Sequence, residues 1–196
     1  HIDALLSRLR GDQLILAGRI DAQLQERLHH YGLQAVDYFA REELTVLNAI
    51  PTSEGGLEIA MRERATTLHG SKCLVIGFGR IGKVLSKMLG GIGAQVTVGA
   101  RSHEAFAWIE VYGYQSIHTS DLKQCIGGYD IVFNTVPVQL LTRPVLENVS
   151  PDALIVDLAS KPGGVDMQAS RELGVKTIWA LSLPGEVAPV SAGDMI

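Results

Sequence analysis

The sequence has few cysteines, no large excess of charge of one sign and no long apolar run. The only cysteines, Cys73 and Cys125, lie in an apolar run and a helical pattern, so we interpret both as buried free thiols and expect a cytoplasmic protein. No apolar run reaches the roughly 18 residues of a membrane span, so we expect none. The net charge is −4, with acidic and basic residues interleaved, so we expect no nucleic-acid partner.

The apolar content of the sequence is high enough for a sizeable core. Hydrophobic residues make up 46% of the 196 residues and charged residues 19%, so we expect a folded and not a disordered chain. From residue 72 onward, continuous apolar runs alternate with helical patterns, as in a parallel sheet that is covered on both faces. We predict strands at 73–78, 95–100, 115–119, 130–137, 153–160 and 175–180, and helices at 80–90, 103–112, 120–127, 143–148 and 166–173. The predicted fold class is therefore α/β, a doubly wound parallel sheet of the Rossmann type.

The residues before this sheet form a separate and smaller pattern. A strand at 13–18, a helix at 21–32 and a strand at 34–39 make one β-α-β unit, which is too small to be a stable lobe alone. We expect residues 1–50 to be a truncated part of a smaller α/β lobe of flavodoxin-like type. Residues 51–70 then form a connecting helix, and residues 71–196 form the Rossmann domain with a C-terminal return segment.

The connecting helix contains two features of interest. Thr52 or Ser53 is a candidate N-cap, because short hydroxyl side chains satisfy the unpaired N–H groups of a first turn. Gly55 and Gly56 are poor helix formers. Either another backbone or a ligand approaches them closely, or they serve ordinary packing.

A glycine motif, "GFGRIG", joins the strand at 73–78 to the helix at 80–90, which is the context that a dinucleotide-binding turn requires. Gly77 would allow the tight turn, Gly79 would let the backbone approach a pyrophosphate, and Gly82 would let helix and strand pack closely. The helix N-terminus then offers N–H groups to the phosphates. The predicted cofactor-binding residues of this turn are Gly77, Phe78, Gly79, Arg80, Ile81 and Gly82.

The acid that holds the adenosine ribose in NAD-binding turns is absent about 20 residues further on. The sequence there reads "TVGARS", so Ala100, Arg101 and Ser102 supply a small residue, a guanidinium group and a hydroxyl group. An arginine pairs with a phosphate where a carboxylate would repel it, so we interpret the three as cofactor-binding and predict NADP, with NAD as a second possibility. Arg80 would add a second positive group. The alternative is that Arg101 is a solvated surface charge.

Polar and Gly/Pro-rich segments follow three later strands, at the sheet edge where ligands of doubly wound folds bind. Lys161 is the one cation among them, and it either binds a substrate carboxylate or is a solvated lysine. Among the six histidines, only the adjacent pair His29 and His30 on the early helix has any metal-ligand context, and we predict no metal. The remaining candidates are Asn134, Thr135, Val136, Pro137, Asp157 and Ala159 for the cofactor, and Thr52, Ser53, Ser160, Lys161, Pro184 and Gly185 for the substrate.

Several motifs together resemble the A chain family of dipicolinate synthase, from about Leu14 to Ile196. The motifs are "NAIPTSEGGLEIAM", "HGSKCLVIGFGRIG", "VTVGARS", "DIVFNTVP", "LIVDLASKPGGVD" and "LPGEVAPVSAGDMI". The resemblance implies an NAD(P)-dependent oxidoreductase in the cytoplasm of the mother cell of a sporulating bacterium. It would oxidise a dihydrodipicolinate-type precursor, a small dicarboxylate, to dipicolinate. The resemblance also implies a flavoprotein-like partner, the B chain of dipicolinate synthase, as well as a homo-oligomer and further chain on both sides of this sequence.

The sequence departs from the wider D-2-hydroxyacid dehydrogenases, which carry an Asn-x-Ala-Arg-Gly pattern where this chain reads "DLASK". Ser160 replaces their catalytic arginine, and no histidine follows His118. The catalytic residue therefore stays unknown. Oxidation of a dihydropyridine needs mainly positioning against the nicotinamide and one modest base. Two alternatives stay open: another NADP-linked oxidoreductase, of shikimate type, and a non-catalytic nucleotide-binding protein with a regulatory or scaffold role.

Overall fold

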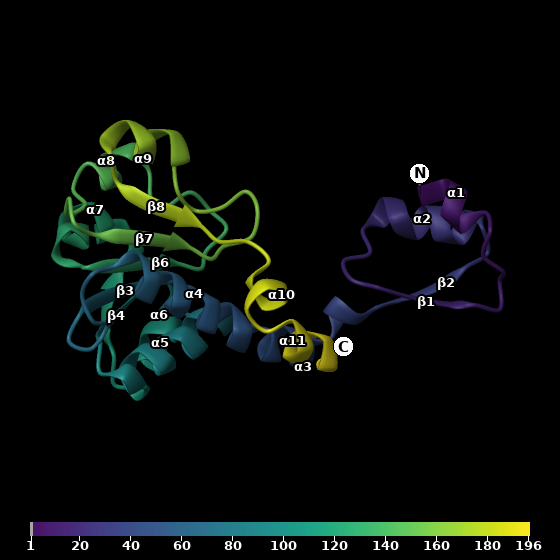
Figure 1. Cartoon of the computed structure of the whole chain (residues 1–196), viewed down its shortest axis with the longest axis horizontal. Helices are drawn as coiled ribbons and strands as arrows, with labels where there is room; N and C mark the ends of the chain where they lie inside the picture. Colours follow the sequence, from purple (N-terminus) through teal and green to yellow (C-terminus); the bar gives the residue numbers. More distant parts are fainter. Residues whose placement is uncertain (1) are drawn as a thin grey trace. The chain divides into compact units, whose positions relative to one another are not determined.

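The computed structural model of the chain describes residues 2–196 and divides them into two compact units. The smaller unit contains residues 2–48 with Gly193–Ile196, and the larger unit contains Ala49–Ala192. Figure 1 shows the elements of both units. No helix in the described part of the chain is long and apolar enough to cross a membrane.

The smaller unit is built on two parallel strands. Leu14 pairs with Gln34 and Leu16 with Val36. Helix α2 begins after Asp21, whose side chain accepts a 2.8 Å hydrogen bond from the Leu24 N–H group, as an N-cap does. The predicted strands and helix of this unit are confirmed, whereas two further helices, α1 and α3, were not predicted. Its elements are α1 (Ile2–Leu6), β1 (Leu14–Ala17), α2 (Ala22–His30), β2 (Gln34–Asp37) and α3 (Glu42–Leu47).

The larger unit contains a sheet of six strands, all parallel, in the order β5-β4-β3-β6-β7-β8. The chain moves outward from β3 in one direction and then returns to start β6 on its other side. This confirms the doubly wound Rossmann topology, in which ligands bind where the strand order reverses. The strands are β3 (Lys72–Ile76), β4 (Gln95–Ala100), β5 (Gln115–His118), β6 (Ile131–Asn134), β7 (Leu154–Asp157) and β8 (Lys176–Trp179).

Helices cover both faces of this sheet. Alternate strand residues face opposite layers: Cys73 and Val75 pack with α4, α5 and α6, whereas Leu74 and Ile76 pack with α7, α8 and α9. Figure 1 shows α4, α5 and α6 together on one side of the sheet. The helices that cover the sheet are α4 (Ala49–Glu63), α5 (Arg80–Ile92), α6 (His103–Val111), α7 (Leu122–Cys125), α8 (Arg143–Leu146) and α9 (Met167–Leu173). Two short helices, α10 (Leu183–Val187) and α11 (Pro189–Asp194), follow β8.

The start of α4 differs from the prediction. Because the helix begins at Ala49, Thr52 and Ser53 lie within its first turns, and the proposed cap at either residue is wrong. Ser53 is fully buried, and its hydroxyl donates a 2.7 Å hydrogen bond to the Ala49 carbonyl group. A serine inside a helix commonly makes this bond to the residue four positions earlier.

The two glycines of α4 serve helix packing. A Cβ atom on Gly55 would lie 2.9 Å from Val187 Cγ2 and 3.1 Å from Leu183 Cβ, so α10 packs directly against the backbone of α4. A Cβ atom on Gly56 would lie 3.1 Å from Leu158 Cδ1. The segment around Leu183 was expected to be a loop. It forms a short helix because burial of Leu183 in this contact outweighs the poor helix propensity of its neighbours.

Candidate functional site

The glycine turn between β3 and α5 places its three glycines in different surroundings. Gly77 has a φ of +98°, and a Cβ atom there would lie 2.5 Å from Thr135 Oγ1. A Cβ atom on Gly82 would overlap the Gly77 carbonyl oxygen, whereas one on Gly79 would meet no atom within 4 Å. Glycine is therefore needed at positions 77 and 82 because the neighbouring protein atoms leave no room for a Cβ atom. Gly79 leaves open space above the N-terminus of α5.

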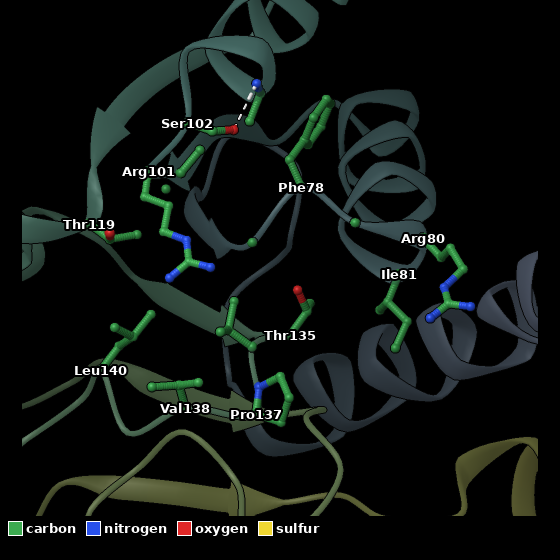
Figure 2. A pocket seen from close by; sticks show the side chains of 16 residues that line it. Phe78, Arg80, Ile81, Arg101, Ser102, Thr119, Thr135, Pro137, Val138 and Leu140 are labelled. Atoms are coloured by element: carbon green, nitrogen blue, oxygen red, sulfur yellow. Dashed lines mark hydrogen bonds between the residues drawn. The ribbon is translucent and has the colours of Figure 1, made fainter. Parts of the chain in front are cut away.

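This open space belongs to a cavity of about 420 Å³ at the carboxyl edge of the sheet. The cavity lies over the point between β3 and β6 where the strand order reverses. Figure 2 shows the side chains around it. Its lining residues are Gly77, Phe78, Gly79, Arg80, Ile81, Gly99, Ala100, Arg101, Ser102, Ala105, Thr119, Thr135, Val136, Pro137, Val138 and Leu140.

Arg101 reaches into this cavity from the end of β4. Figure 2 shows its guanidinium group directed toward the space between Thr119 and Thr135. Arg80 lies on the opposite side of the same view, so the two guanidinium groups do not converge on one position. A phosphate beside Arg101 would therefore pair with the guanidinium group of Arg101 and not with that of Arg80.

Hydroxyl groups lie next to Arg101. Ser102 is the N-cap of α6, and its Oγ accepts a 3.2 Å hydrogen bond from the Ala105 N–H group. A hydroxyl oxygen that accepts one bond can still donate its proton to a ligand. Thr119, at the end of the neighbouring strand β5, adds a second hydroxyl group to the lining. This end of the cavity is thus rich in donors.

The lining contains no carboxylate. Two of its sixteen residues are arginines, and none is aspartate or glutamate. The positive end of the α5 backbone dipole adds to the same sign of potential. The cavity is suited to an anionic ligand that carries phosphate groups.

Eleven of the fifteen predicted cofactor residues line the cavity. The other four are Gly82, Asn134, Asp157 and Ala159, which are all buried. Asn134 Nδ2 donates a 2.7 Å hydrogen bond to Asp157 Oδ1, so these two side chains face each other below the cavity lining. Five lining residues were not predicted: Gly99, Ala105, Thr119, Val138 and Leu140. Two of them, Thr119 and Val138, lie at or just beyond predicted strand ends, a signal that could have identified them.

The loop after β7 presents two of the substrate candidates on a fixed backbone. Trp179 Nε1 donates a 2.9 Å hydrogen bond to the Ala159 carbonyl group, and the Gly163 N–H donates a 2.9 Å bond to the Ser160 carbonyl group. Both Ser160 and Lys161 are exposed. Their side chains are therefore available to a ligand although the loop that carries them is held in place.

The remaining substrate candidates lie on two helices that pack together. Thr52 is half-buried on α4, and Ser53 is buried without access to solvent. Pro184 and Gly185 belong to α10, which contacts α4 through Gly55. The described residues contain no group of three or more His, Cys, Asp or Glu side chains that could hold a metal ion.

Comparison with known proteins identifies relatives of this chain. Residues 50–160 match the family model of the D-isomer specific 2-hydroxyacid dehydrogenase NAD binding domain. The chain is 37% identical to the dipicolinate synthase A chain of Bacillus subtilis (strain 168) over 191 residues, which is 97% of this chain and 64% of that protein. This finding confirms the resemblance that the motifs predicted. The chain therefore spans less than two thirds of the length of this curated relative.

Two solved structures are similar to the whole chain. The dipicolinate synthase A chain from Bacillus subtilis superposes with a TM-score of 0.89 at 36% identity, covering 98% of this chain and 65% of that one. The dipicolinate synthase A chain from Bacillus halodurans superposes with a TM-score of 0.92 at 30% identity, covering 98% of this chain and 66% of that one.

Proposed function

Because the chain belongs to the family of the D-isomer specific 2-hydroxyacid dehydrogenase NAD binding domain, we propose that it is the nucleotide-binding part of an NADP-linked dehydrogenase that makes dipicolinate. Its substrate would be a dihydrodipicolinate-type precursor. The similarity to the dipicolinate synthase A chain over 97% of the present chain supports this choice among dehydrogenases.

The observation that carries the choice of NADP is the charge of the cavity lining. Arg101 extends into a cavity lined by no carboxylate, and the Ser102 and Thr119 hydroxyl groups lie at the same end. A guanidinium group donates two parallel N–H bonds to a phosphate, while a carboxylate in its place would repel one. Arg101 and Ser102 would hold the 2′-phosphate, and the backbone at Gly79 would approach the pyrophosphate.

The bound nucleotide would supply the hydride acceptor, and the protein would supply positioning. Thr135, Val136 and Pro137 form the cavity wall at the end of β6, where the nicotinamide would lie. Lys161 is the exposed cation on the adjacent loop and is our candidate for pairing with a substrate carboxylate. Thr52 and Ser160 are further candidates, whereas the burial of Ser53 argues against direct contact with a ligand.

The proposal extends to partners and location through the similarity to the A chain of the synthase. We propose the flavoprotein-like B chain of dipicolinate synthase as partner, a homo-oligomeric state, and the cytoplasm of the mother cell of a sporulating bacterium. These three proposals concern the full length of the relatives, and this chain covers only 64% of the curated relative and 65% of the Bacillus subtilis chain in the solved structure.

Turnover tests the proposal directly. Full-length protein is supplied with enzymatically generated dihydrodipicolinate and NADP, with and without the flavoprotein-like partner. The expected result is the formation of dipicolinate together with reduced nicotinamide, which is measured by its absorbance. Binding of NADPH without any turnover in either mixture would instead favour a non-catalytic nucleotide-binding protein.

A further inference from the structure

We infer that Asp157 and Asn134 are positioning residues, which fix the cofactor-facing wall of the cavity to the loop that carries Lys161 through one buried hydrogen-bond network. The inference rests on the proposed function only in that the cavity binds a nicotinamide nucleotide. It changes the role that the sequence predicted for both residues, since neither side chain lines the cavity.

Asp157 holds both ends of the loop at 158–164. Its Oδ1 accepts a 3.1 Å hydrogen bond from the Ala159 N–H group, and its Oδ2 accepts a 2.8 Å bond from the Gly164 N–H group. Ser160 and Lys161 lie between these two attachment points. Only 1% of the Asp157 surface is exposed, so water does not compete for these bonds.

Asn134 holds the wall of the cavity. Its Oδ1 accepts a 3.2 Å bond from the Val136 N–H group, and its Nδ2 donates a 3.0 Å bond to the Val136 carbonyl group. Both backbone polar groups of a lining residue are therefore tied to one side chain. The Nδ2 group also donates to Asp157 Oδ1 at 2.7 Å, which joins the wall to the loop.

The loop is also packed against the same amide. A Cβ atom on Gly164 would overlap Asn134 Nδ2 and would lie 2.7 Å from the Val136 carbonyl oxygen. Gly164 thus has no room to move toward the wall, and Asn134 is fully buried between the two segments. A displacement of one segment must displace the other.

The network requires a carboxylate at position 157. Three N–H donors, from Asn134, Ala159 and Gly164, point at its two oxygen atoms. An asparagine of the same shape has one oxygen and one NH₂ group, so at least one donor would face another donor. Asp157→Asn is therefore a nearly isosteric change that disrupts the network without creating a cavity.

The experiment measures nucleotide affinity, which needs no turnover. Dissociation constants of NADPH and of NADH are measured by calorimetric titration for Asp157→Asn, Asn134→Asp and the double variant. We expect each single variant to weaken the binding of both nucleotides by roughly tenfold, because the network acts on the backbone of Val136 and makes no hydrogen bond with Arg101 or Ser102. The double variant should lose less than the product of the two single losses. In it the amide and the carboxylate exchange positions, so that one amide again donates to one carboxylate.

A matched control separates positioning from stability. Leu89 is fully buried near the C-terminal end of α5, whereas the cavity borders the N-terminal end of that helix, so Leu89→Ala lowers stability by leaving a cavity away from the network. At a temperature where all variants remain folded by circular dichroism, Leu89→Ala should keep both dissociation constants. Amide spectra of ¹⁵N-labelled protein should show the Val136 and Gly164 signals shifted in Asp157→Asn and not in Leu89→Ala.

Two results would overturn the inference. Unchanged affinities in the folded single variants would show that the network does not position the wall. A loss confined to NADPH would show that the residues act at the 2′-phosphate instead. Absence of dehydrogenase turnover would contradict the proposed function but would leave these binding measurements valid.

Discussion

Gly82 lies so close to Gly77 that a Cβ atom on residue 82 would overlap the Gly77 carbonyl oxygen. This contact joins the first turn of α5 to the end of β3, across the turn that forms the floor of the cavity. Because the obstacle is backbone, it cannot be relieved by a change of rotamer.

Replacement of Gly82 by alanine should therefore move α5 or the turn and destabilise the larger unit. A small-to-large change in a closely packed site costs about 1–3 kcal/mol. We expect a lower midpoint of urea unfolding for Gly82→Ala and weaker nucleotide binding. Gly91→Ala is the matched control, since a Cβ atom there meets no atom within 4 Å in the same helix, and it should stabilise the protein by about 0.5–1 kcal/mol. Equal stability of Gly82→Ala and the unsubstituted chain would contradict this account.

Replacement of Gly79 by alanine should weaken nucleotide binding without lowering protein stability. A Cβ atom there meets no protein atom, and its φ is −81°, which alanine adopts without strain. Gly79→Ala should therefore keep the unfolding midpoint while it weakens NADPH binding by at least about tenfold, because a methyl group would occupy the approach to the pyrophosphate. The measurement is calorimetric titration beside denaturant unfolding. Unchanged affinity would place the pyrophosphate elsewhere.

The larger sheet could be predicted because its strands are buried on both faces and read as continuous apolar runs. The strand at 130–137 was predicted too long for a physical reason. The strand ends at Asn134, the Thr135 N–H group makes one last bond to the Ile76 carbonyl group of β3, and Val136 and Pro137 then form the cavity wall. Helix α10 was missed because its stability comes from burial of Leu183 against Gly55, a contact between residues more than 120 positions apart.

The glycine turn could be predicted because a Cβ atom at Gly77 or Gly82 would lie too close to neighbouring atoms, so that only glycine fits at these positions. The burial and mutual hydrogen bond of Asn134 and Asp157 could not be predicted, since a position at a strand end does not reveal the direction of the side chain. Their mutual hydrogen bond joins residues 23 positions apart, and no local pattern encodes it. Sequence therefore identified most of the segments that line the cavity, and the structure separates the lining residues from those buried beneath them.

The thiol of Cys73 should make stability decline at high pH. Burial raises the pKa of Cys73 from 9 to about 12, with a smaller contribution from the Asp130 carboxylate. A raised folded-state pKa means that the unfolded chain loses its proton first as pH rises above 9, so stability present below pH 9 is lost progressively up to about pH 12. At pH 10.5 the loss should be about 2 kcal/mol relative to pH 8.

Comparison with Cys73→Ala isolates this effect from other groups that titrate at high pH. The difference in unfolding free energy between the two proteins should shrink from pH 8 to pH 10.5.

At pH 8 a thiol reagent should modify the half-buried Cys125 before Cys73, since the Cys73 thiol is fully buried. A difference that stays constant with pH, or early modification of Cys73, would contradict the buried neutral thiol.

Arg101→Asp should shift nucleotide binding by the cavity away from NADPH and toward NADH. The change removes the guanidinium group that would pair with the 2′-phosphate and places a carboxylate at the end of β4, where it would repel that phosphate and accept bonds from ribose hydroxyl groups. We expect the ratio of NADH to NADPH dissociation constants to fall by at least about tenfold, as measured by calorimetric titration. The control is Arg171→Asp on α9, which has the same effect on net charge, is exposed, and lies outside the cavity lining. Because surface charges act weakly across a screened distance, this control should leave the ratio unchanged. An unchanged ratio in Arg101→Asp would mean that Arg101 is a solvated surface charge and that the missing acid does not select NADP.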